Sequence, residues 1–226
     1  MTQQKDKIMT PSGQHIDYIP PLHINRLTVF YDLFMRLLMR DARIKAKLID
    51  DAAIKDGQHI LDLGCGTGTL MLMIKRRYPE ADLTGLDIDS ESLRLALHKS
   101  YKAKSSIALV KGSAIQLPYA SETFDRVLSS LVYHHLRSDK KVSSMQEVLR
   151  VLKPGGHFLL ADFGKPGNFI MSMMSRVLGK IEDVSDNVRG LMPVMMIQAG
   201  FADVSELETF FTPFGTLAFY RGKKLK

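Results

Sequence analysis

The sequence predicts an α/β protein with a doubly wound sheet, in which helices cover both faces of mostly parallel strands. Short apolar runs that favour strands alternate with longer segments whose apolar residues recur at three- and four-residue steps, as in helices. Such alternation is typical of a sheet built from strand–helix–strand units. A glycine-rich turn, Gly64 to Gly68, directly follows the first apolar run of this pattern, and ligands bind at such turns.

The elements are expected in regular order up to residue 166. Strands are expected at 59–63, 82–87, 107–111, 124–130 and 157–163, and helices at 67–77, 90–100 (with Ser90 as N-cap) and 139–152. The chain then becomes methionine-rich over 169–182. A helix is expected at 186–199, followed by an antiparallel hairpin of strands at about 204–211 and 215–221, turning at Pro213 and Gly215.

The chain is long enough for one domain of α/β size. We expect residues 1–50, which include a basic helix at 27–49, to form part of a lid, and residues 51–226 to form the core. Within that core, residues 166–196 are expected to connect over the substrate. Their thioethers adapt to irregular apolar ligands, although ordinary core packing explains the same composition.

Composition excludes several functional classes. The single cysteine, Cys65, rules out an internal disulfide and a thiolate-bound zinc or iron–sulfur site, and it fits a reducing compartment. No secretory signal or membrane span is evident, so we expect a soluble, cytoplasmic protein. The formal net charge of +7 favours contact with anionic partners or surfaces.

The spacing of the glycines indicates the kind of ligand. They fall as G-x-G-x-G directly after Asp62-Leu63, whereas a dinucleotide fold has G-x-G-x-x-G. Glycine lets a ligand approach the backbone, and the following helix points free N–H groups at it. Asp87 ends the second predicted strand, where its carboxylate can accept hydrogen bonds from both ribose hydroxyls of a nucleoside.

Four motifs in order resemble those of the class I S-adenosylmethionine-dependent methyltransferases. They are D-L-G-C-G-T-G from Asp62, G-L-D-I-D from Gly85, L-P-Y with F-D from Leu117, and V-L-R-V-L-K-P-G-G from Val148. The resemblance covers roughly residues 50 to 165. It implies a Rossmann-like seven-stranded sheet with an antiparallel C-terminal strand. It also implies S-adenosyl-L-methionine as methyl donor, S-adenosyl-L-homocysteine as product and no need for a metal.

The resemblance also implies which residues hold the donor. Asp62 would contact its ammonium group or cap the turn, and Asp87 would hold the ribose. Ile88 would pack on the adenine or in the core, and Cys65 is a compact filler rather than a nucleophile. The family's usual adenine-binding aspartate is replaced by Ser113, whose hydroxyl accepts without charge assistance. The remaining candidate donor contacts are Gly64, Gly66, Gly68, Ala114, Ser130, Leu131 and Tyr31, the last of which is alternatively a core aromatic.

The segment after the fourth strand lies where the donor meets the acceptor. His134 is the favoured general base, with His135 second, since imidazole titrates near neutrality. Alternatively, both histidines only organise the loop. Tyr133 is a candidate for lining the acceptor pocket.

The sequence gives fewer signals for the methyl acceptor than for the donor. The start of the chain and the stretch from Ala161 to Pro166 resemble quinone-ring C-methyltransferases, but the F-G-L-R-N pattern of that group is absent. We expect methyl transfer to a small apolar or lipid-like acceptor, with C-, O- and N-methylation open.

The alternatives are an RNA or protein methyltransferase, or a non-catalytic donor-binding scaffold. Nucleic acid is disfavoured, because Ser-Ser-Leu-Val stands where base-amine methyltransferases carry N/D-P-P-Y/F. Peripheral contact with an anionic membrane is compatible with the charge, and the protein is expected to be a monomer or homodimer.

Overall fold

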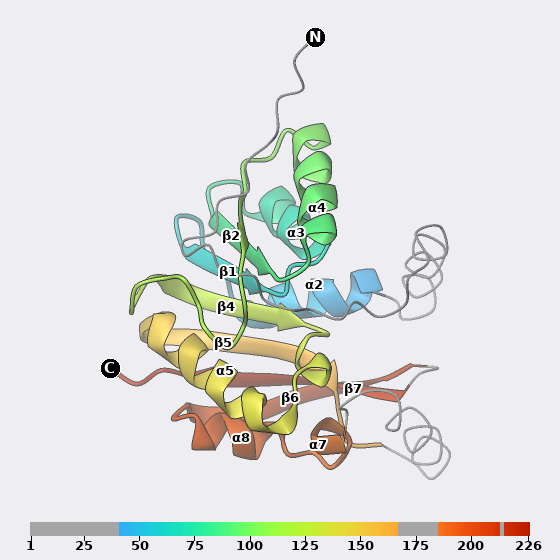
Figure 1. Cartoon of the computed structure of the whole chain (residues 1–226), viewed down its shortest axis with the longest axis vertical. Helices are drawn as coiled ribbons and strands as arrows, with labels where there is room; N and C mark the ends of the chain where they lie inside the picture. The colour runs from blue at the N-terminus through green and yellow to red at the C-terminus, as the bar shows by residue number, and fades with distance from the viewer. Residues whose placement is uncertain (1–40, 167–184, 213–214) are drawn as a thin grey trace.

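The computed structural model describes residues 41–166, 185–212 and 215–226. Its seven strands form one sheet in the order β3-β2-β1-β4-β5-β7-β6 (Figure 1). The strands are β1 His59–Leu63, β2 Asp82–Asp87, β3 Ala108–Lys111, β4 Phe124–Ser130, β5 Leu152–Phe163, β6 Ala202–Thr212 and β7 Gly215–Lys223.

The pairing directions confirm the predicted fold class. Strands β1 to β5 pair in parallel, whereas β7 runs antiparallel to both β5 and β6. Strands β2 and β3 follow β1 on one side of the sheet, and β5 follows β4 on the other side. The strand order therefore reverses between β1 and β4. In such sheets the crevice outside the carboxyl ends of the strands at this reversal is the ligand site.

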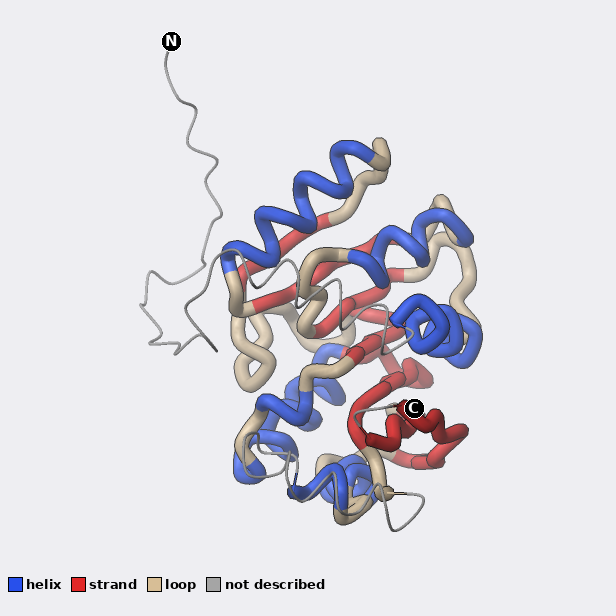
Figure 2. Tube along the Cα trace, turned by 90° about the vertical axis from the view of Figure 1, so that its right-hand side faces the viewer, coloured by secondary structure: helices blue, strands red, loops and turns tan. Residues whose placement is uncertain are grey.

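Helices cover both faces of the sheet (Figure 2). They are α2 Asp41–Ala52, α3 Thr69–Arg77, α4 Ser90–Lys102, α5 Ser138–Val151, α7 Ser185–Val188 and α8 Met192–Gln198, with a 3₁₀ turn η1 at Tyr133–His135. One apolar cluster joins α2, α3 and α4 to one face, and a second joins α5 and α8 to the other. Alternate residues of each central strand feed the two clusters, because successive side chains point to opposite faces.

Helix α2 belongs to the core. Its Ile44, Leu48 and Ile49 recur at helical spacing and are each at most 2% exposed. The predicted boundary at residue 50 therefore falls inside a helix of the core. The rest of the predicted lid (residues 1–40, with Tyr31), and 167–184 of the predicted connection, lie outside the described residues.

Three local predictions were wrong. The single helix at 186–199 is instead two short helices, because Gly190 adopts a left-handed conformation (φ +74°) after α7 and Pro193 begins the next turn. Asp89, not Ser90, caps α4 by accepting from the backbone N–H of Glu91 and Ser92. Strand β5 begins at Leu152, since Gly155 and Gly156 exchange backbone hydrogen bonds with Lys224.

No helix within the described ranges is both long enough and apolar enough to span a membrane.

Candidate active site

The glycine turn after β1 is fastened to β2. The carbonyl of Leu86 accepts from the N–H of Gly64 at 2.8 Å and of Cys65 at 3.0 Å. Gly64, Gly66 and Gly68 all have positive φ, so each occupies a conformation that glycine adopts without steric cost. The first and second differ in their surroundings. A Cβ on Gly64 would overlap Val132, whereas one on Gly66 would meet no atom of the described residues within 4 Å. Gly64 is therefore a packing position, and Gly66 faces space that the described residues leave open.

Asp87 joins this turn to the end of β2. Its carboxylate accepts from the N–H of Gly66 at 2.7 Å and of Asp89 at 2.9 Å. Its pKa is raised, chiefly because burial penalises the charged form. The backbone carbonyl of Asp87 also accepts from Gly112 at 3.0 Å, which places the segment around Ser113 beside it. The structure thus brings the predicted nucleoside residues together at one edge.

The segment that we expect to contact the adenine is less polar than the family pattern, because Ser113 stands in place of an aspartate. The Ser113 hydroxyl accepts from the N–H of Ile115 at 3.4 Å, a long hydrogen bond within its own turn. Ala114 is half-buried against the α5 side of the core, and Ile88 is half-buried at the end of β2.

Asp62 is a buried carboxylate whose Oδ2 has no hydrogen-bond partner among the described residues. It is 3% exposed, and burial raises its pKa to about 7, with a further upward contribution from the charge of Asp87. Lys45 acts in the opposite direction. The Ser130 hydroxyl at the end of neighbouring β4 is also buried, and the part of the chain that the structure describes offers it no hydrogen-bond partner. Buried polar atoms normally have partners, so two such atoms on neighbouring strands indicate a site for a polar ligand.

Cys65 lies on the inner side of the turn. Its sulfur occupies the space next to Gly85, where an added Cβ would lie 2.8 Å from Sγ and 2.5 Å from the sulfur of Met71. Burial raises the pKa of the thiol, so the reactive thiolate is suppressed. These contacts favour the predicted role as a filler.

The loop after β4 adopts a strained conformation at its first residue. Leu131 has φ +58°, which is uncommon for a leucine, and its N–H donates to the carbonyl of Ala161 at 2.8 Å. This places Val132 against Gly64 and starts η1 directly beside the glycine turn. The loop that carries the candidate bases therefore abuts the candidate donor site.

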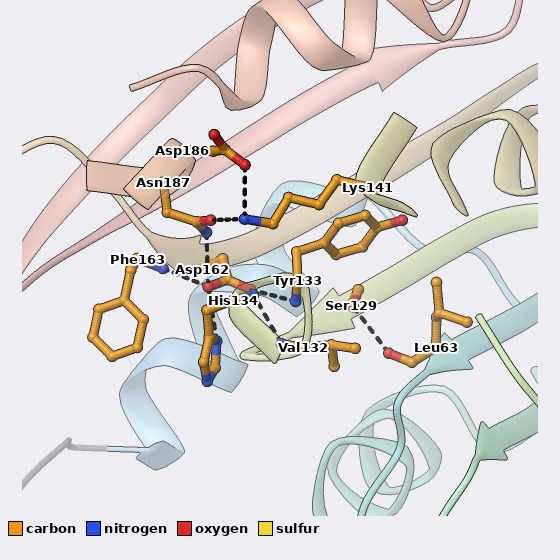
Figure 3. A network of polar contacts seen from close by, with 10 residues as sticks. All are labelled: Leu63, Ser129, Val132, Tyr133, His134, Lys141, Asp162, Phe163, Asp186 and Asn187. Atoms are coloured by element: carbon orange, nitrogen blue, oxygen red, sulfur yellow. Dashed lines mark hydrogen bonds and ion pairs between the residues drawn. The ribbon is translucent and has the colours of Figure 1, made fainter. Parts of the chain in front are cut away.

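His134 is held by a buried carboxylate from β5 (Figure 3). Its Nδ1 lies 3.0 Å from Oδ1 of Asp162, which is fully buried and accepts from the backbone N–H of Val132, Tyr133 and Phe163 at 3.1, 2.7 and 2.7 Å. Burial acts to raise the pKa of Asp162, but His134 and the N–H groups of Phe163 and Tyr133 outweigh it and lower that pKa. An ionised Asp162 only accepts, so Nδ1 carries the hydrogen in the neutral ring and Nε2 keeps its lone pair.

Sequence reasoning did not single out Asp162 as functional. The available signal was a lone aspartate at the carboxyl end of the fifth predicted strand, Ala161-Asp162-Phe163. The ring of His135 lies 3.9 Å from that of His134, and its side chain is more exposed.

The structure does not bring Tyr133 into the same arrangement. It is fully buried in the core, and its hydroxyl lies 3.0 Å from that of Ser144 on α5. This position favours packing over acceptor contact.

Two of the recognised motif segments make structural contacts with each other. Glu147 and Arg150 form hydrogen bonds with the backbone of Leu117, and Lys153 pairs with Asp125 at 2.7 Å.

No group of three or more His, Cys, Asp or Glu side chains suited to a metal ion occurs within the ranges that the structure describes.

Comparison with known proteins identifies the class. Residues 60–156 match the family model described as "Methyltransferase domain". The chain is 32% identical to the ubiquinone/menaquinone biosynthesis C-methyltransferase of Syntrophotalea carbinolica, covering 80% of this chain and 84% of that one. It is 29% identical to the demethylmenaquinone methyltransferase of Thermus thermophilus, covering 80% and 91%. Phosphoethanolamine N-methyltransferase 2 of Haemonchus contortus, solved with S-adenosyl-L-methionine, shares the fold (TM-score 0.67, 17% identity, 80% of this chain and 52% of that one).

The chain belongs to the class I S-adenosylmethionine-dependent methyltransferases. Within that class its sequence is similar to quinone-biosynthesis C-methyltransferases. The predictions of fold, enzyme class and donor are thereby confirmed.

The site fits the donor. An unpartnered buried carboxylate oxygen on Asp62 suits an ammonium group, and open space above Gly66 leaves room for the ligand against the backbone. The oxygens of Asp87 each accept one backbone N–H and keep lone pairs for hydroxyl donors.

Proposed function

We propose that the protein methylates a small, lipid-like acceptor of the hydroxylated aromatic class, such as a reduced quinone precursor. Two findings support this. The relatives named above are quinone-ring C-methyltransferases. In addition, the His134–Asp162 pair provides a base beside the donor turn, which a ring hydroxyl requires to become an electron-rich nucleophile. The mechanism proposed below depends on this His134–Asp162 pair.

S-adenosylmethionine supplies an electrophilic methyl group on a sulfonium. Asp62 and Asp87 would hold the ammonium and ribose of that donor. Nε2 of His134 would take the proton from the acceptor hydroxyl, while Asp162 stabilises the resulting imidazolium and holds the ring. Alignment of the acceptor with the methyl group and exclusion of water would supply the rest of the acceleration.

The direct test measures turnover with a reduced naphthoquinone as acceptor. His134→Ala should lower kcat by about 10²–10⁴-fold, the usual contribution of a general base. Affinity for S-adenosylhomocysteine should stay within about twofold, since the imidazole is not a proposed donor contact. His135→Ala is the matched comparison and should retain most turnover. Normal turnover in His134→Ala would assign that histidine a structural role.

An RNA or protein acceptor is the second candidate. The relatives do not favour it, and it is separated by following labelled methyl groups into organic-soluble, RNA and protein fractions. Label in the organic extract alone supports the lipid-like acceptor. A non-catalytic scaffold, suggested by Ser113, predicts donor binding with no transfer to any fraction.

We also propose peripheral contact with anionic membrane, supported by the net charge of +7. Some of the basic side chains that contribute to this charge already have partners within the protein. Lys45 and Lys47 on α2 are ion-paired with Asp41 and Asp51, and Lys224 donates to the carbonyl of Leu152 at 2.8 Å. Co-sedimentation with phosphatidylglycerol vesicles at low and high salt tests the contact, and absence of binding at low salt would refute it. Sedimentation velocity would distinguish a monomer from a homodimer, the two expected states.

A further inference from the structure

A cluster of buried polar groups lies beside Asp162, the carboxylate that contacts His134. Lys141 on α5 and Asn187 on α7 are fully buried, as is Asp162, and Asp186 is 6% exposed (Figure 3). The proposed reaction gives Lys141, Asp186 and Asn187 no role. A fully buried lysine is costly unless it is paired, so its presence here calls for a function or a compensating network.

The hydrogen bonds of the cluster form a continuous chain to the histidine. Nζ of Lys141 donates to Oδ2 of Asp186 at 3.2 Å and to Oδ1 of Asn187 at 2.9 Å. Nδ2 of Asn187 donates to Oδ1 of Asp162 at 3.1 Å, and that oxygen also lies 3.0 Å from Nδ1 of His134.

The orientation of the Asn187 amide follows from its two neighbours. Lys141 only donates and an ionised Asp162 only accepts, so the opposite orientation would create two repulsive contacts. The amide oxygen therefore faces Lys141 and the amide nitrogen faces Asp162. Through these two hydrogen bonds, Asn187 connects the charge of Lys141 to the carboxylate that holds His134.

The charges of the cluster bear directly on the protonation of His134. Among the described residues, the charged and titratable groups around it include Asp162 on β5, Lys141 on α5, Asp186 on α7 and His135 on η1. The phenols of Tyr133 and Tyr220 also interact with Asp162, and burial raises their pKa, so they stay neutral. Replacing Lys141 removes one positive charge and replacing Asp186 removes one negative charge, so the two changes act on His134 in opposite directions.

We propose that the Lys141–Asp186 pair, linked through the positioning residue Asn187, sets the pH at which His134 becomes available as a base. The inference rests on the proposed function only for its catalytic consequence. Loss of the ammonium leaves the cluster more negative and holds the proton on His134 to higher pH. Loss of the Asp186 charge does the reverse. Three successive contacts, through Asn187 and Asp162, join Lys141 to His134. In general, a unit charge about 10 Å from a titrating group shifts its titration by about one pH unit at an effective dielectric constant of about 20.

The test is a pH titration of the His134 ring by ¹⁵N NMR, with the pH dependence of kcat/KM measured alongside. Lys141→Met keeps an unbranched chain of similar length, and Asp186→Asn keeps the size of the side chain. We expect the ring titration to move up by about one pH unit in the first variant and down by a similar amount in the second. The double variant should return close to the original value.

Lys140→Met is the matched control. Lys140 is the neighbouring residue on α5, but its side chain is 50% exposed, so solvent screens its charge and the titration should stay within about 0.2 pH unit. Equal shifts in all variants, or shifts of the same sign for Lys141→Met and Asp186→Asn, would overturn the inference. If Lys141→Met does not fold, an unshifted Asp186→Asn titration is enough to overturn it.

The two readouts separate this inference from the function on which it rests. If the ring titrations move as expected while the acid limb of the rate profile stays fixed, the cluster tunes His134 but His134 is not the base. If the acid limb follows the ring titration in each variant, both stand.

Discussion

Replacing glycine with alanine at Gly64 and at Gly66 should produce two different defects, although the residues are two positions apart in the same turn. Both have left-handed backbone conformations, with φ +73° and +51°. Only at Gly64 is the space beyond the Cα already filled: a methyl group there would overlap Cγ2 of Val132 and lie 3.0 Å from Cγ1. At Gly66 it would meet no atom of the described residues within 4 Å and would project into the region that we propose for the donor.

The magnitudes follow from these contacts. The left-handed conformation costs a residue with a Cβ about 1–2 kcal/mol, which applies to both variants. Overpacking against Val132 adds about 1–3 kcal/mol to Gly64→Ala alone. The free energy of unfolding should therefore fall further in Gly64→Ala by that difference, equivalent to about 2–12 °C in Tm for a chain of this size. Gly66→Ala should instead weaken S-adenosylhomocysteine binding by at least about tenfold.

Thermal unfolding and calorimetric titration with S-adenosylhomocysteine measure the two effects separately. Val132→Ala removes both clashing atoms, so combining it with Gly64→Ala should recover about 1–3 kcal/mol in a double-mutant cycle. The same substitution combined with Gly66→Ala is the control and should recover nothing. Equal stability losses in the two glycine variants, or no recovery with Val132→Ala, would refute the packing argument.

Three further predictions concern the polar residues and the thiol of the same site. Burial raises the pKa of Asp62 to about 7 in the folded protein, well above that of an exposed aspartate in the unfolded chain. Between these two pKa values the folded state binds more protons than the unfolded one, so stability without ligand should decline as pH rises through that window. Asp62→Asn should remove this decline, worth about 4 kcal/mol, while weakening donor binding at pH 8; a decline that persists in denaturant titrations would contradict the assignment. Asp87→Ala should weaken S-adenosylhomocysteine binding by at least about tenfold and leave far-UV circular dichroism unchanged, and unaltered calorimetric affinity would show that Asp87 only closes the turn. Cys65 should resist iodoacetamide in the native protein and react on unfolding, because burial keeps its thiol protonated; rapid native labelling followed by mass spectrometry would contradict this.

Sequence patterns located the elements of the core well, because the relevant signals are local. Apolar spacing identified α2 to α5 and β1 to β4, and the order of motifs led us to propose the glycine turn and Asp87 as donor contacts. Local signals also existed where the prediction was wrong. Gly190 and Pro193 divide the expected helix at 186–199, and the apolar periodicity on either side concealed the break.

The candidate site likewise has one part that local sequence encodes and another that depends on tertiary packing. A strand, a glycine turn and a following carboxylate lie within one strand–helix–strand unit, so their chemistry and their proximity are both encoded in a short stretch of sequence. The chain alone therefore determined the fold class, the family and the donor. The surroundings of His134 are assembled from β5, α5 and α7, with Asp162 and Asn187 far from it along the chain. Only tertiary packing brought those groups within hydrogen-bonding distance and buried Tyr133. The protonation and orientation of a buried side chain depend on which charges lie within a few ångströms, and that is a property of the folded structure.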